Sequence, residues 1–438
     1  MSIDFVILAA GLGTRMNSVI PKLLQTIAGK PIIRYVIDLC KSINPKNLIS
    51  VISKNFESNE FFEDVKTVVQ THPKGTANAV LHAIPYIDSE YVIVTCGDVP
   101  LLEKRHLDLL ISDRHPVSFL VMEIPDELAC MPYGRVILDN DSSFQKVVEY
   151  KNATDFEKEI KTANTGIYKF EANLLRKYIK KIEENFISKE FYLTDILEIL
   201  KADGIEIFAI NTEEYWPFHG INTMEDLSKA EKVAQSRLRK AFMEKGVKLC
   251  APDSIYFSYD TSIEADVTIE PNVVFGKNVK IKSGSVIKSF SYISDCEIMN
   301  DVEIGPFARL RGNSKISPHS SVGNFVEIKQ TTFGKSSKAK HLSYIGNSVI
   351  GESSNIGAGT IICNYDGVKK HDTVIGDNVF VGSNSTLIAP IEIENNSIIA
   401  AGSVINRSVS QNSLAISRVK QEEIKDGATK VWKKKRKL

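Results

Sequence analysis

The sequence lacks a net charge, a membrane-length apolar run and a cysteine cluster, and each absence excludes a class of protein. Lys plus Arg and Asp plus Glu number 54 each, so there is no overall basic surface for nucleic acid, and any anion site must be local. No apolar run approaches the length of a membrane-spanning helix, and the first residues lack a signal-peptide pattern. The basic stretch from Trp432 to Lys437 is expected to be a solvated end, although it could contact an anionic ligand.

Cysteine is also sparse. The six cysteines are scattered without a CxxC pair, which predicts neither a disulfide framework nor a zinc site and fits a reducing, cytoplasmic location. What the chain does have is length, because 438 residues exceed one typical hydrophobic core. We therefore expect two domains.

The first stretch with a chemical signature follows an apolar run near the N-terminus. The run Phe5 to Leu8 suits a strand buried on both faces of a parallel sheet. Gly11 and Gly13 then allow a tight turn in which peptide N–H groups converge on an anion. Arg15 and Lys22 add positive charge. The turn fits neither the dinucleotide fingerprint nor the Walker loop, so by itself it is either a phosphate cradle or an ordinary strand-to-helix turn with solvated cations.

Strand and helix patterns alternate through the first half of the chain. Helical patterns cover 32–41 and 76–84, and apolar strand patterns cover 48–52 and 91–95. This alternation predicts a doubly wound, Rossmann-like α/β domain with a mostly parallel sheet. Ligands of such domains bind beyond the carboxyl ends of the strands.

Two polar features fall at those strand ends. Asp98 can hold Mg²⁺ against phosphate oxygens, or it can form an Asx-type turn that Pro100 ends. Gln70 and the backbone of Gly75 can read the edge of a base, and Thr76 can equally be a plain helix N-cap. The residues alone do not choose between these alternatives.

The full string from Leu8 to Met16, with Pro21 and Lys22 after it, resembles the signature of nucleotidyltransferases that join a sugar phosphate to a nucleoside triphosphate. With later turns in the same order, the first half is similar to the uridylyltransferase domain of bacterial N-acetylglucosamine-1-phosphate uridyltransferases. Those turns are Tyr133-Gly134-Arg135, Glu149-Tyr150-Lys151, Asn164-Thr165-Gly166 and Gly220-Ile221-Asn222.

The resemblance implies the residues of a nucleotide-sugar site. Those that would contact UTP or the sugar nucleotide are Leu8, Ala9, Ala10, Gly11, Lys22, Gln70, Gly75, Thr76, Gly134, Glu149, Asn164 and Asn222. Within this set, Gln70, Gly75 and Thr76 would hold the uracil, and Gly134, Glu149 and Asn164 would hold the amino sugar. Arg15 and Lys22 would be the catalytic cations, and Asp98 and Asn222 the Mg²⁺ ligands.

Two residues depart from the family pattern. Leu12 stands where many relatives carry lysine, which removes one cation from the triphosphate, and Cys96 replaces a residue that is often tyrosine. Because Arg15 and Lys22 remain, we expect activity to survive.

The second half of the sequence is repetitive. Helical spacing over 225–245 predicts one long amphipathic arm, and from about Ile269 an aliphatic or aromatic residue recurs every sixth position, often followed by glycine. The recurring residues are Ile269, Phe275, Ile281, Ile287, Ile293, Ile304, Leu310, Ile316, Val322, Ile328, Ile350, Ile356, Ile362, Val368, Ile375, Val381, Leu387, Ile393, Ile399 and Ile405. Such hexapeptide repetition predicts a parallel β-helix whose apolar residues point into a stacked interior.

The repeat breaks at 333–345, where we expect an inserted loop, and inserted loops on a solenoid commonly carry its function. The break contains His341. Acyl transfer to an amine needs a base of near-neutral pKa, which an imidazole supplies, although a lone histidine is more often structural. The reaction also needs donors for the thioester oxyanion and cations for a sugar phosphate.

Repeats of this type resemble the left-handed β-helix acyltransferases, which work as trimers with active sites between subunits. The residues here are similar to those of the glucosamine-1-phosphate acetyltransferase domain, which implies His341 as the general base. The amino-sugar phosphate would bind Arg311, Lys329, Tyr344 and Asn355. Acetyl-CoA would bind Ala358, Asn364, Tyr365, Ser383, Ala401 and Arg418.

Together the resemblances cover nearly the whole chain and imply a bifunctional enzyme that makes UDP-N-acetylglucosamine. They imply Mg²⁺ as cofactor, acetyl-CoA as co-substrate and a homotrimer, with UTP and glucosamine-1-phosphate as substrates and with neither nucleic-acid binding nor membrane insertion. We expect a uridylyltransferase domain at 1–224, a helical linker at 225–250 and an acetyltransferase domain at 251–438.

Two alternatives remain open. In a single-activity sugar-nucleotide pyrophosphorylase the β-helix would only oligomerise or bind regulators, which leaves the polar cluster around His341 unexplained. In a non-catalytic scaffold the nucleotide site would be dead, against which the intact Arg15, Lys22, Asp98 and Asn222 argue.

Overall fold

The computed structural model describes residues 2–11, 13–139, 143–185 and 189–435.

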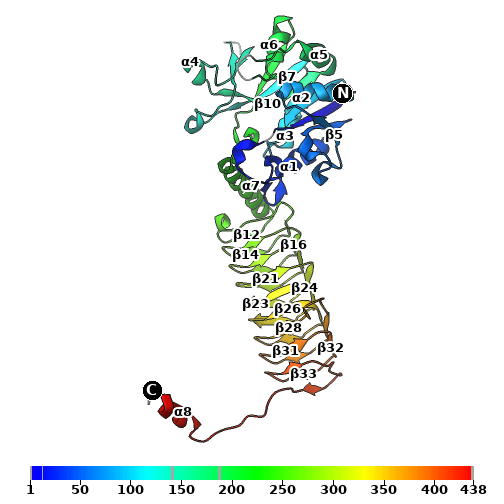
Figure 1. The fold of residues 1–438 in the computed structure, drawn as a ribbon, viewed down its shortest axis with the longest axis vertical. Helices are drawn as coiled ribbons and strands as arrows, with labels where there is room; N and C mark the ends of the chain where they lie inside the picture. The colour runs from blue at the N-terminus through cyan, green and yellow to red at the C-terminus, as the bar shows by residue number, and fades with distance from the viewer. Residues whose placement is uncertain (1, 12, 140–142, 186–188, 436–438) are drawn as a thin grey trace. The chain divides into compact units, whose positions relative to one another are not determined.

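The chain forms two compact units, 1–235 and 236–438, and each is described by itself (Figure 1). The division falls inside helix α7 (Met224–Glu244). The bounds of α7 agree to within one residue with the helical arm predicted over 225–245. No helix within the described ranges is long and apolar enough to cross a membrane.

The first unit is built on a nine-stranded sheet with the order β11-β7-β10-β6-β1-β4-β5, to which β8 and β9 attach through β10. Its strands are β1 (Ile3–Ala9), β4 (Leu48–Ser53), β5 (Lys66–Gln70), β6 (Tyr91–Cys96), β7 (Val117–Glu123), β8 (Arg135–Leu138), β9 (Phe144–Val148), β10 (Thr162–Glu171) and β11 (Ile207–Asn211). Along the main path only the pairs made by β10 are antiparallel. The mostly parallel sheet predicted from the sequence is confirmed.

Both faces of this sheet are buried, and strand β1 shows why its sequence is uniformly apolar. Phe5, Ile7 and Ala9 belong to one hydrophobic cluster, whereas Val6 belongs to the other. Successive side chains of a strand point to opposite faces, so a strand covered on both sides needs an unbroken apolar run.

Helices flank the sheet, and their bounds agree with the sequence patterns where these were assigned. They are α1 (Ile32–Ser42), α2 (Thr76–Ala83), α3 (Lys104–Ser112), α4 (Asp155–Lys158), α5 (Ala172–Tyr178) and α6 (Asp195–Ala202), and the short strands β2 (Thr26–Ile27) and β3 (Lys30–Pro31) precede α1. The predicted helices and strands at 32–41, 48–52, 76–84 and 91–95 each match to within one residue.

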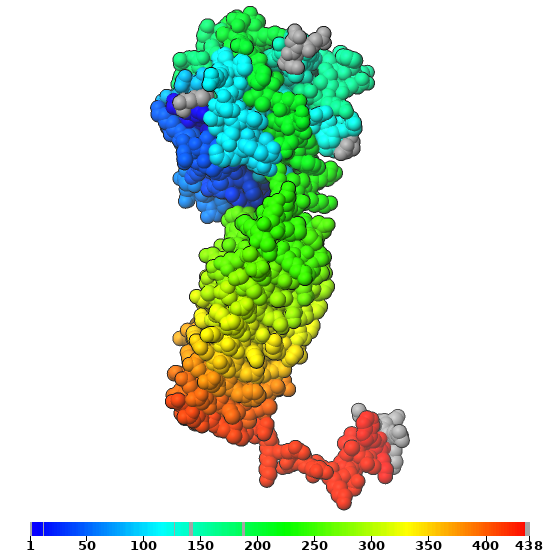
Figure 2. Space-filling model, turned by 180° about the vertical axis from the view of Figure 1, so that it is seen from behind, coloured from blue at the N-terminus to red at the C-terminus, as the bar shows by residue number. Residues whose placement is uncertain are grey.

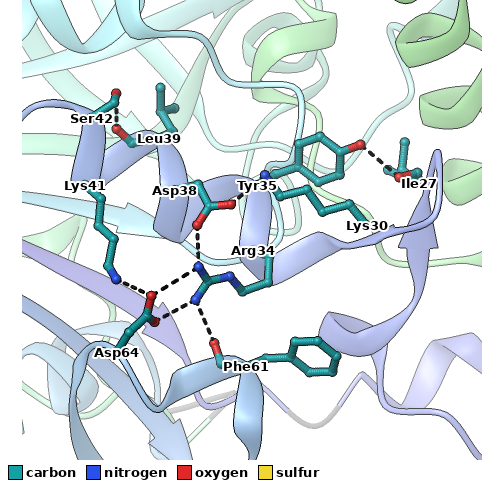
Figure 3. A network of polar contacts seen from close by, with 10 residues as sticks. All are labelled: Ile27, Lys30, Arg34, Tyr35, Asp38, Leu39, Lys41, Ser42, Phe61 and Asp64. Atoms are coloured by element: carbon teal, nitrogen blue, oxygen red, sulfur yellow. Dashed lines mark hydrogen bonds and ion pairs between the residues drawn. The ribbon is translucent and has the colours of Figure 1, made fainter. Parts of the chain in front are cut away.

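A charged network holds α1 to the turn that follows β4 (Figure 3). Arg34 donates to Phe61 O at 3.2 Å and to Asp64 Oδ1 at 2.7 Å, and it also pairs with Asp38 one helical turn away. Lys41 contacts the second oxygen of Asp64. Hydrogen bonding to Arg34, with Lys41 beside it, lowers the pKa of Asp64 to about 2. Because the groups are partly exposed, the network fixes geometry more than it adds stability.

The second unit is a parallel β-helix. One face is a ten-stranded sheet of β12 (Lys248–Leu249), β14 (Thr268–Ile269), β17 (Val286–Ile287), β20 (Glu303–Ile304), β23 (Ser321–Asn324), β25 (Lys338–His341), β27 (Asn355–Ile356), β30 (Phe380–Val381), β33 (Ile398–Ile399) and β35 (Leu414–Ala415). All of its pairs are parallel.

A fourteen-stranded sheet covers the other two faces, because its two longest strands run through a corner. Its strands are β13 (Ser262–Ile263), β15 (Val274–Phe275), β16 (Val279–Ile281), β18 (Tyr292–Ile293), β19 (Cys296–Ile298), β21 (Arg309–Arg311), β22 (Ser314–Ile316), β24 (Glu327–Phe333), β26 (Tyr344–Ile350), β28 (Ile361–Cys363), β29 (Thr373–Ile375), β31 (Thr386–Ile388), β32 (Ile391–Ile393) and β34 (Val404–Ile405). Successive coils follow one another in chain order along the unit (Figure 2). After the coils comes α8 (Gly427–Lys435), and Arg436 and Lys437 of the basic end lie outside the described residues.

The residues of the predicted hexapeptide repeat are buried in one continuous core, with one exception. Val368 is 89% exposed, so its assignment to the repeat is wrong. It lies in the segment 364–372 between β28 and β29, and strands paired across this segment are 25 residues apart, as Ile362 is from Leu387. Between the first and last coils, the other paired residues are 17 or 18 apart, as Ile328 and Ile345 or Ile269 and Ile287 are. This segment is the inserted loop of the unit.

The predicted interruption at 333–345 is also wrong. Phe333, Ala339 and Ile345 are fully buried, and strands β25 and β26 form regular coils there. The sixfold count is lost because the step from Ile328 to Phe333 is five residues. That step occurs where β24 runs through the corner at Gln330. The corner is one residue shorter there, and Ile328 and Phe333 on either side of it still point into the core.

Candidate active sites

The first site is a cavity of about 590 Å³ in the first unit, at the carboxyl ends of β1, β5 and β6. Eleven residues expected at a nucleotide site line it: Leu8, Ala9, Ala10, Gly11, Arg15, Lys22, Gln70, Gly75, Thr76, Asp98 and Asn222. They come from five separate stretches of chain. The parallel strands bring these stretches to one edge, where open α/β sheets bind ligands.

Two glycines in this wall have no room for a side chain. At Gly13, with φ of 63°, a Cβ atom would lie 2.5 Å from Lys22 Cβ. At Gly75, with φ of 96°, it would lie 2.5 Å from Phe191 O. The first glycine lets the loop close on Lys22, and the second lets helix α2 begin against the segment at Phe191.

The cations of this cavity are bound to oxygen atoms. Lys22 Nζ lies 2.6 Å from Asp98 Oδ2 and 3.3 Å from Asn222 Oδ1. Arg15 donates to the same Asn222 oxygen at 2.8 Å. A carboxylate and an amide oxygen therefore already face one cation, the Lys22 ammonium. Both are hard oxygen donors of the kind Mg²⁺ takes, alongside water and phosphate oxygens.

These two oxygens fit a divalent ion held mainly by substrate and water rather than an all-protein cage. Consistent with that, no cluster of three or more His, Cys, Asp or Glu residues suited to a metal occurs in the described part of the chain.

The residues proposed to face a base are ordered by their neighbours. Gln70 is almost fully buried and donates from Nε2 to Asn78 Oδ1 at 2.7 Å. Thr76 is the first residue of α2 rather than its N-cap, which is Gly75, so the N-cap interpretation is wrong. Its hydroxyl accepts a hydrogen bond from Leu193 N at 2.9 Å.

Gly134, Glu149 and Asn164 form a separate cluster that is not part of the cavity wall. Asn164 N donates to Gly134 O at 2.9 Å, and a Cβ atom on Gly134 would lie 3.6 Å from Glu149 Oε1. Burial raises the pKa of Glu149. Burial, and then the nearby Glu149 and Glu198 carboxylates, raise the pKa of Asp195 to about 6.

Cys96 joins the cluster to the cavity. Its thiol lines the cavity wall and lies 3.3 Å from where a Cβ atom of Gly166 would stand. Burial, and to a lesser extent Asp98, raise its pKa to about 12, so it is a thiol and not a thiolate at neutral pH. Leu12, the other departure from the family pattern, lies outside the described residues.

The second site is divided between two corners of the β-helix. At the first corner, residues in equivalent positions of successive coils form a column. The column consists of Asn324, His341, Ala358, Ser383 and Ala401. Arg418 reaches its end and donates to Ala401 O at 2.7 Å.

Asn324 fixes the orientation of the His341 ring. The Asn324 Oδ1 atom lies 2.6 Å from His341 Nδ1, and the two residues are register partners in β23 and β25. The amide oxygen accepts the Nδ1 proton, which leaves Nε2 of the exposed ring with a free lone pair. Sequence analysis missed Asn324, although its position one coil before His341 follows from the repeat.

The second corner collects positive charge. Arg311 and Lys329 are register partners in β21 and β24, and Arg311 pairs with Glu327 at 2.7 Å. The pKa of Lys329 is lowered, chiefly by the adjacent ammonium of Lys370, then by burial, and further by the charge of Arg311. Sequence analysis missed Lys370, because it predicted the inserted loop at 333–345, whereas the loop that carries Lys370 is 364–372.

The remaining predicted residues lie between or beside these corners. Asn364 donates from Nδ2 to Asn347 Oδ1 at 2.7 Å and lies 3.5 Å from Tyr344 Oη, so it sits with the cations. Tyr365 donates to Gly367 O at 2.7 Å inside the inserted loop. Asn355 lies on the ten-stranded face opposite Lys338.

His341 has no contact with Arg311 or Lys329 among the described residues. His341 immediately precedes the corner residue Leu342, whereas Lys329 immediately precedes Gln330, which lies at a different corner of the β-helix. One face of the prism separates the two corners, a span of about 15 Å at the rise of a β-strand. A single chain therefore holds His341 and the cations on different edges.

The comparisons with known proteins match the first half of the chain and the second half to different families of domain. Residues 5–140 match the model of the MobA-like NTP transferase domain, 260–295 and 372–407 match the bacterial transferase hexapeptide model, and 292–388 match the GMPPB C-terminal domain. Three curated relatives are each named bifunctional protein GlmU. That of Thermodesulfovibrio yellowstonii is 42% identical over 99% of this chain and all of the relative. That of Wolbachia pipientis is 42% identical over 95% of this chain, and that of Francisella tularensis subsp. novicida is 43% identical over 97%; each match covers 97% of the relative.

Proposed function

The chain belongs to the family of bifunctional GlmU proteins, and on that premise we propose how its two units divide the synthesis of UDP-N-acetylglucosamine. The enzyme acetylates glucosamine-1-phosphate with acetyl-CoA and then transfers a uridylyl group from UTP to the product, releasing pyrophosphate. The observation that carries the division is the presence of two separate cationic sites, one in each unit.

In the first unit, the loop after β1 and the ends of β5 and β6 would bind UTP. Arg15 and Lys22 reach into the cavity, where they would spread the negative charge that builds on the triphosphate as pyrophosphate leaves. The phosphate oxygen of the sugar phosphate attacks the α-phosphorus, and the bond to pyrophosphate breaks. Gly134, Glu149 and Asn164 would orient the sugar so that this oxygen is in line.

Asp98 and Asn222 would hold Mg²⁺, which neutralises phosphate charge when bound. Lys22 Nζ already bridges these two side chains. The ammonium would therefore shift toward the phosphates on metal binding. The donor set supports this assignment, since both oxygens already share a cation.

In the second unit, His341 Nε2 would take the proton from the amine of glucosamine-1-phosphate as its nitrogen attacks the thioester carbonyl. The C–S bond then breaks and coenzyme A leaves as the thiol. Arg311 and Lys329, with Lys370, would bind the sugar phosphate, and Tyr344 and Asn355 would contact the sugar. Acetyl-CoA would lie along the column below His341, against Ala358, Ser383, Ala401 and Arg418, and near Asn364 and Tyr365.

This site needs a second copy of the chain, which supports the homotrimer. The base and the cations lie on different corners, so a neighbouring copy would supply the missing half. Exposed apolar side chains stack along the His341 corner: Phe290 lies 4.9 Å from Phe307, which lies 5.2 Å from Phe325, between ring centroids. Leu342 continues this exposed stripe. A contiguous apolar stripe of this kind is typical of a protein interface.

We also propose the domain boundaries at 1–224, 225–250 and 251–438, and the cytoplasmic location. Cell fractionation tests the location, and separate expression of the two halves tests the boundaries.

A reconstitution assay tests the function. Purified enzyme with glucosamine-1-phosphate, acetyl-CoA, UTP and Mg²⁺ should release both free coenzyme A thiol and pyrophosphate. Leaving out acetyl-CoA should abolish both products, whereas leaving out UTP or Mg²⁺ should abolish only pyrophosphate. If pyrophosphate is released from N-acetylglucosamine-1-phosphate but no thiol ever appears, the single-activity alternative holds.

A further inference from the structure

A buried histidine between two loops of the first unit has no role in the chemistry described above. His219 is 2% exposed and belongs to the segment that leads from β11 to α7. Its Nδ1 atom lies 2.9 Å from Tyr133 Oη and 2.7 Å from Tyr215 Oη. Its Nε2 atom lies 3.2 Å from Asp226 Oδ1.

On one side, His219 holds the loop that carries Gly134. Tyr133 immediately precedes Gly134, whose carbonyl accepts from Asn164. Tyr133 is half-buried, and its hydroxyl hydrogen-bonds with His219 Nδ1 as well as with Tyr215 and the backbone of Gly220. A shift of this phenol would displace Gly134, which the proposed function assigns to the sugar.

On the other side, His219 Nε2 lies at ion-pair distance from the residue that orders Asn222, without a well-formed hydrogen bond to it. Asp226 Oδ2 accepts from Asn222 N at 3.0 Å and from Thr223 N at 2.9 Å, and Asp226 N donates to Thr223 Oγ1 at 3.1 Å. These bonds form a reciprocal cap at the start of α7. The cap fixes the backbone that aims Asn222 Oδ1 at Lys22.

The same segment also touches Asp98 through the main chain. Ile221 N donates to Asp98 O at 3.0 Å, and a Cβ atom on Gly220 would lie 3.6 Å from either carboxylate oxygen. The loop between His219 and Asp226 thus contacts both oxygen donors of the cation site.

We propose that His219 is a positioning residue that couples the sugar-binding loop to the Asp98–Asn222 cation site. Sugar phosphate that orders Tyr133 and Gly134 thereby orders Asp226 and Asn222, and a divalent cation at that site favours the same loop arrangement in return. This inference rests on the proposed uridylyltransferase function. It adds a residue that touches neither ligand but links their binding.

The variants separate the two contacts of the ring. His219→Asn keeps a polar atom near the Nδ1 position and loses the contact with Asp226, whereas His219→Gln reaches toward Asp226 and loses the tyrosines. His219→Phe removes both. His115→Phe is the control, because His115 is a half-buried histidine of the same unit whose partners, Asp113 and Glu206, lie on neither loop.

The measurement is binding and not turnover. Mn²⁺, as a paramagnetic probe for the divalent site, is titrated into the full-length enzyme with and without UDP-N-acetylglucosamine, and the ratio of the two dissociation constants gives the coupling. By linkage, the cation must tighten the sugar nucleotide by the same factor. We expect His219→Phe to reduce this ratio roughly fivefold without bringing it to one, because phosphate oxygens of the nucleotide also ligate the ion, and each of His219→Asn and His219→Gln to reduce it partly.

Two controls keep the test decisive. His115→Phe should keep the wild-type ratio, and thermal melts identify any variant whose first unit is unfolded. A folded His219→Phe enzyme with the wild-type ratio overturns the proposal. If the wild-type enzyme itself binds no UDP-N-acetylglucosamine, the proposed function fails instead, and the two failures are distinguished.

Discussion

In the first unit the cations of the candidate site are paired with oxygen donors, whereas in the second unit cations face one another. Lys22 is within 2.6 Å of Asp98, and Arg15 donates to Asn222. At the β-helix corner, Lys329 has its pKa lowered by Lys370, and Glu327 pairs with Arg311 at 2.7 Å. We propose that both arrangements bind phosphate, although one begins with its cations paired and the other with its cations adjacent to one another.

The difference follows from the surroundings of each site. The Lys22 and Asp98 side chains are only 10% and 22% exposed, and a buried charge needs a partner of opposite sign. Lys329 is partly exposed on a corner, where the solvent screens repulsion between like charges. If the first site binds phosphate and a metal as proposed, its ion pair must rearrange when they arrive. The second is arranged for an anion beforehand.

The largest expected effect separates the two sites by chemistry. His341→Ala should lower acetyl transfer by about 10²- to 10⁴-fold, because it removes the general base, and it should leave uridylyl transfer unchanged. The rates of thiol and pyrophosphate release from the same preparation measure both activities. His319→Ala, an exposed histidine at another corner of the β-helix, is the control. Intact acetyl transfer in His341→Ala would show that His341 is not the general base.

The next effect concerns the tight packing of the first site. Gly75→Ala places a methyl group 2.5 Å from Phe191 O, so the start of α2 must move. A shift near 1 Å costs up to about 100-fold in rate, so uridylyl transfer should fall strongly while acetyl transfer persists. Gly204→Ala is matched, since Gly204 also has a positive φ, of 75°, but open space around it. It should cost only about 1 kcal/mol of stability. Equal uridylyl activity in the two variants would contradict the steric account.

A smaller effect tests the like-charged corner of the second site. Lys370→Met should raise KM for glucosamine-1-phosphate about tenfold, since a charge-assisted hydrogen bond to phosphate is lost. The pKa of Lys329 should rise in this variant, because the lysine that lowers it is gone. Initial-rate kinetics give KM, and NMR titration of labelled lysines gives the pKa. Lys369→Met is the neighbouring control, and an unchanged KM in Lys370→Met would place the phosphate elsewhere.

The smallest effect concerns pH and the buried carboxylates of the first unit. The pKa of Asp195 is raised to about 6, above its value in the unfolded chain, so the folded state binds the extra proton. Stability of this unit should therefore fall as pH rises from about 4 to about 6. Asp195→Asn should raise the melting temperature at pH 7 by a few degrees at most, with the gain disappearing below about pH 4. Calorimetry at both pH values tests this, and a gain that is equal at both would contradict the cause.

The sequence predicted the strands and helices of the first unit closely, because their apolar patterns reflect burial that each strand meets locally. It predicted the β-helix from the same kind of local repetition. It failed at 333–345 and at Val368, where the count of six breaks. In the sequence, a five-residue step and an inserted loop both interrupt the sixfold count, so they cannot be told apart. Only the pairing register of neighbouring coils distinguishes them.

The amino-acid sequence by itself was enough to predict which residues carry chemistry, since motif order needs no coordinates: Arg15, Lys22 and Asp98 in one unit, and His341 in the other. Only the tertiary structure decided how they are grouped. It brought Asn222 to Lys22 across 200 residues, joined Lys370 to Lys329, and set His341 on a different corner from Arg311. The physical reason is that the chemical type of a side chain is a property of one residue. The distance between two side chains instead depends on the order of the strands and the register of the coils, which the whole chain determines.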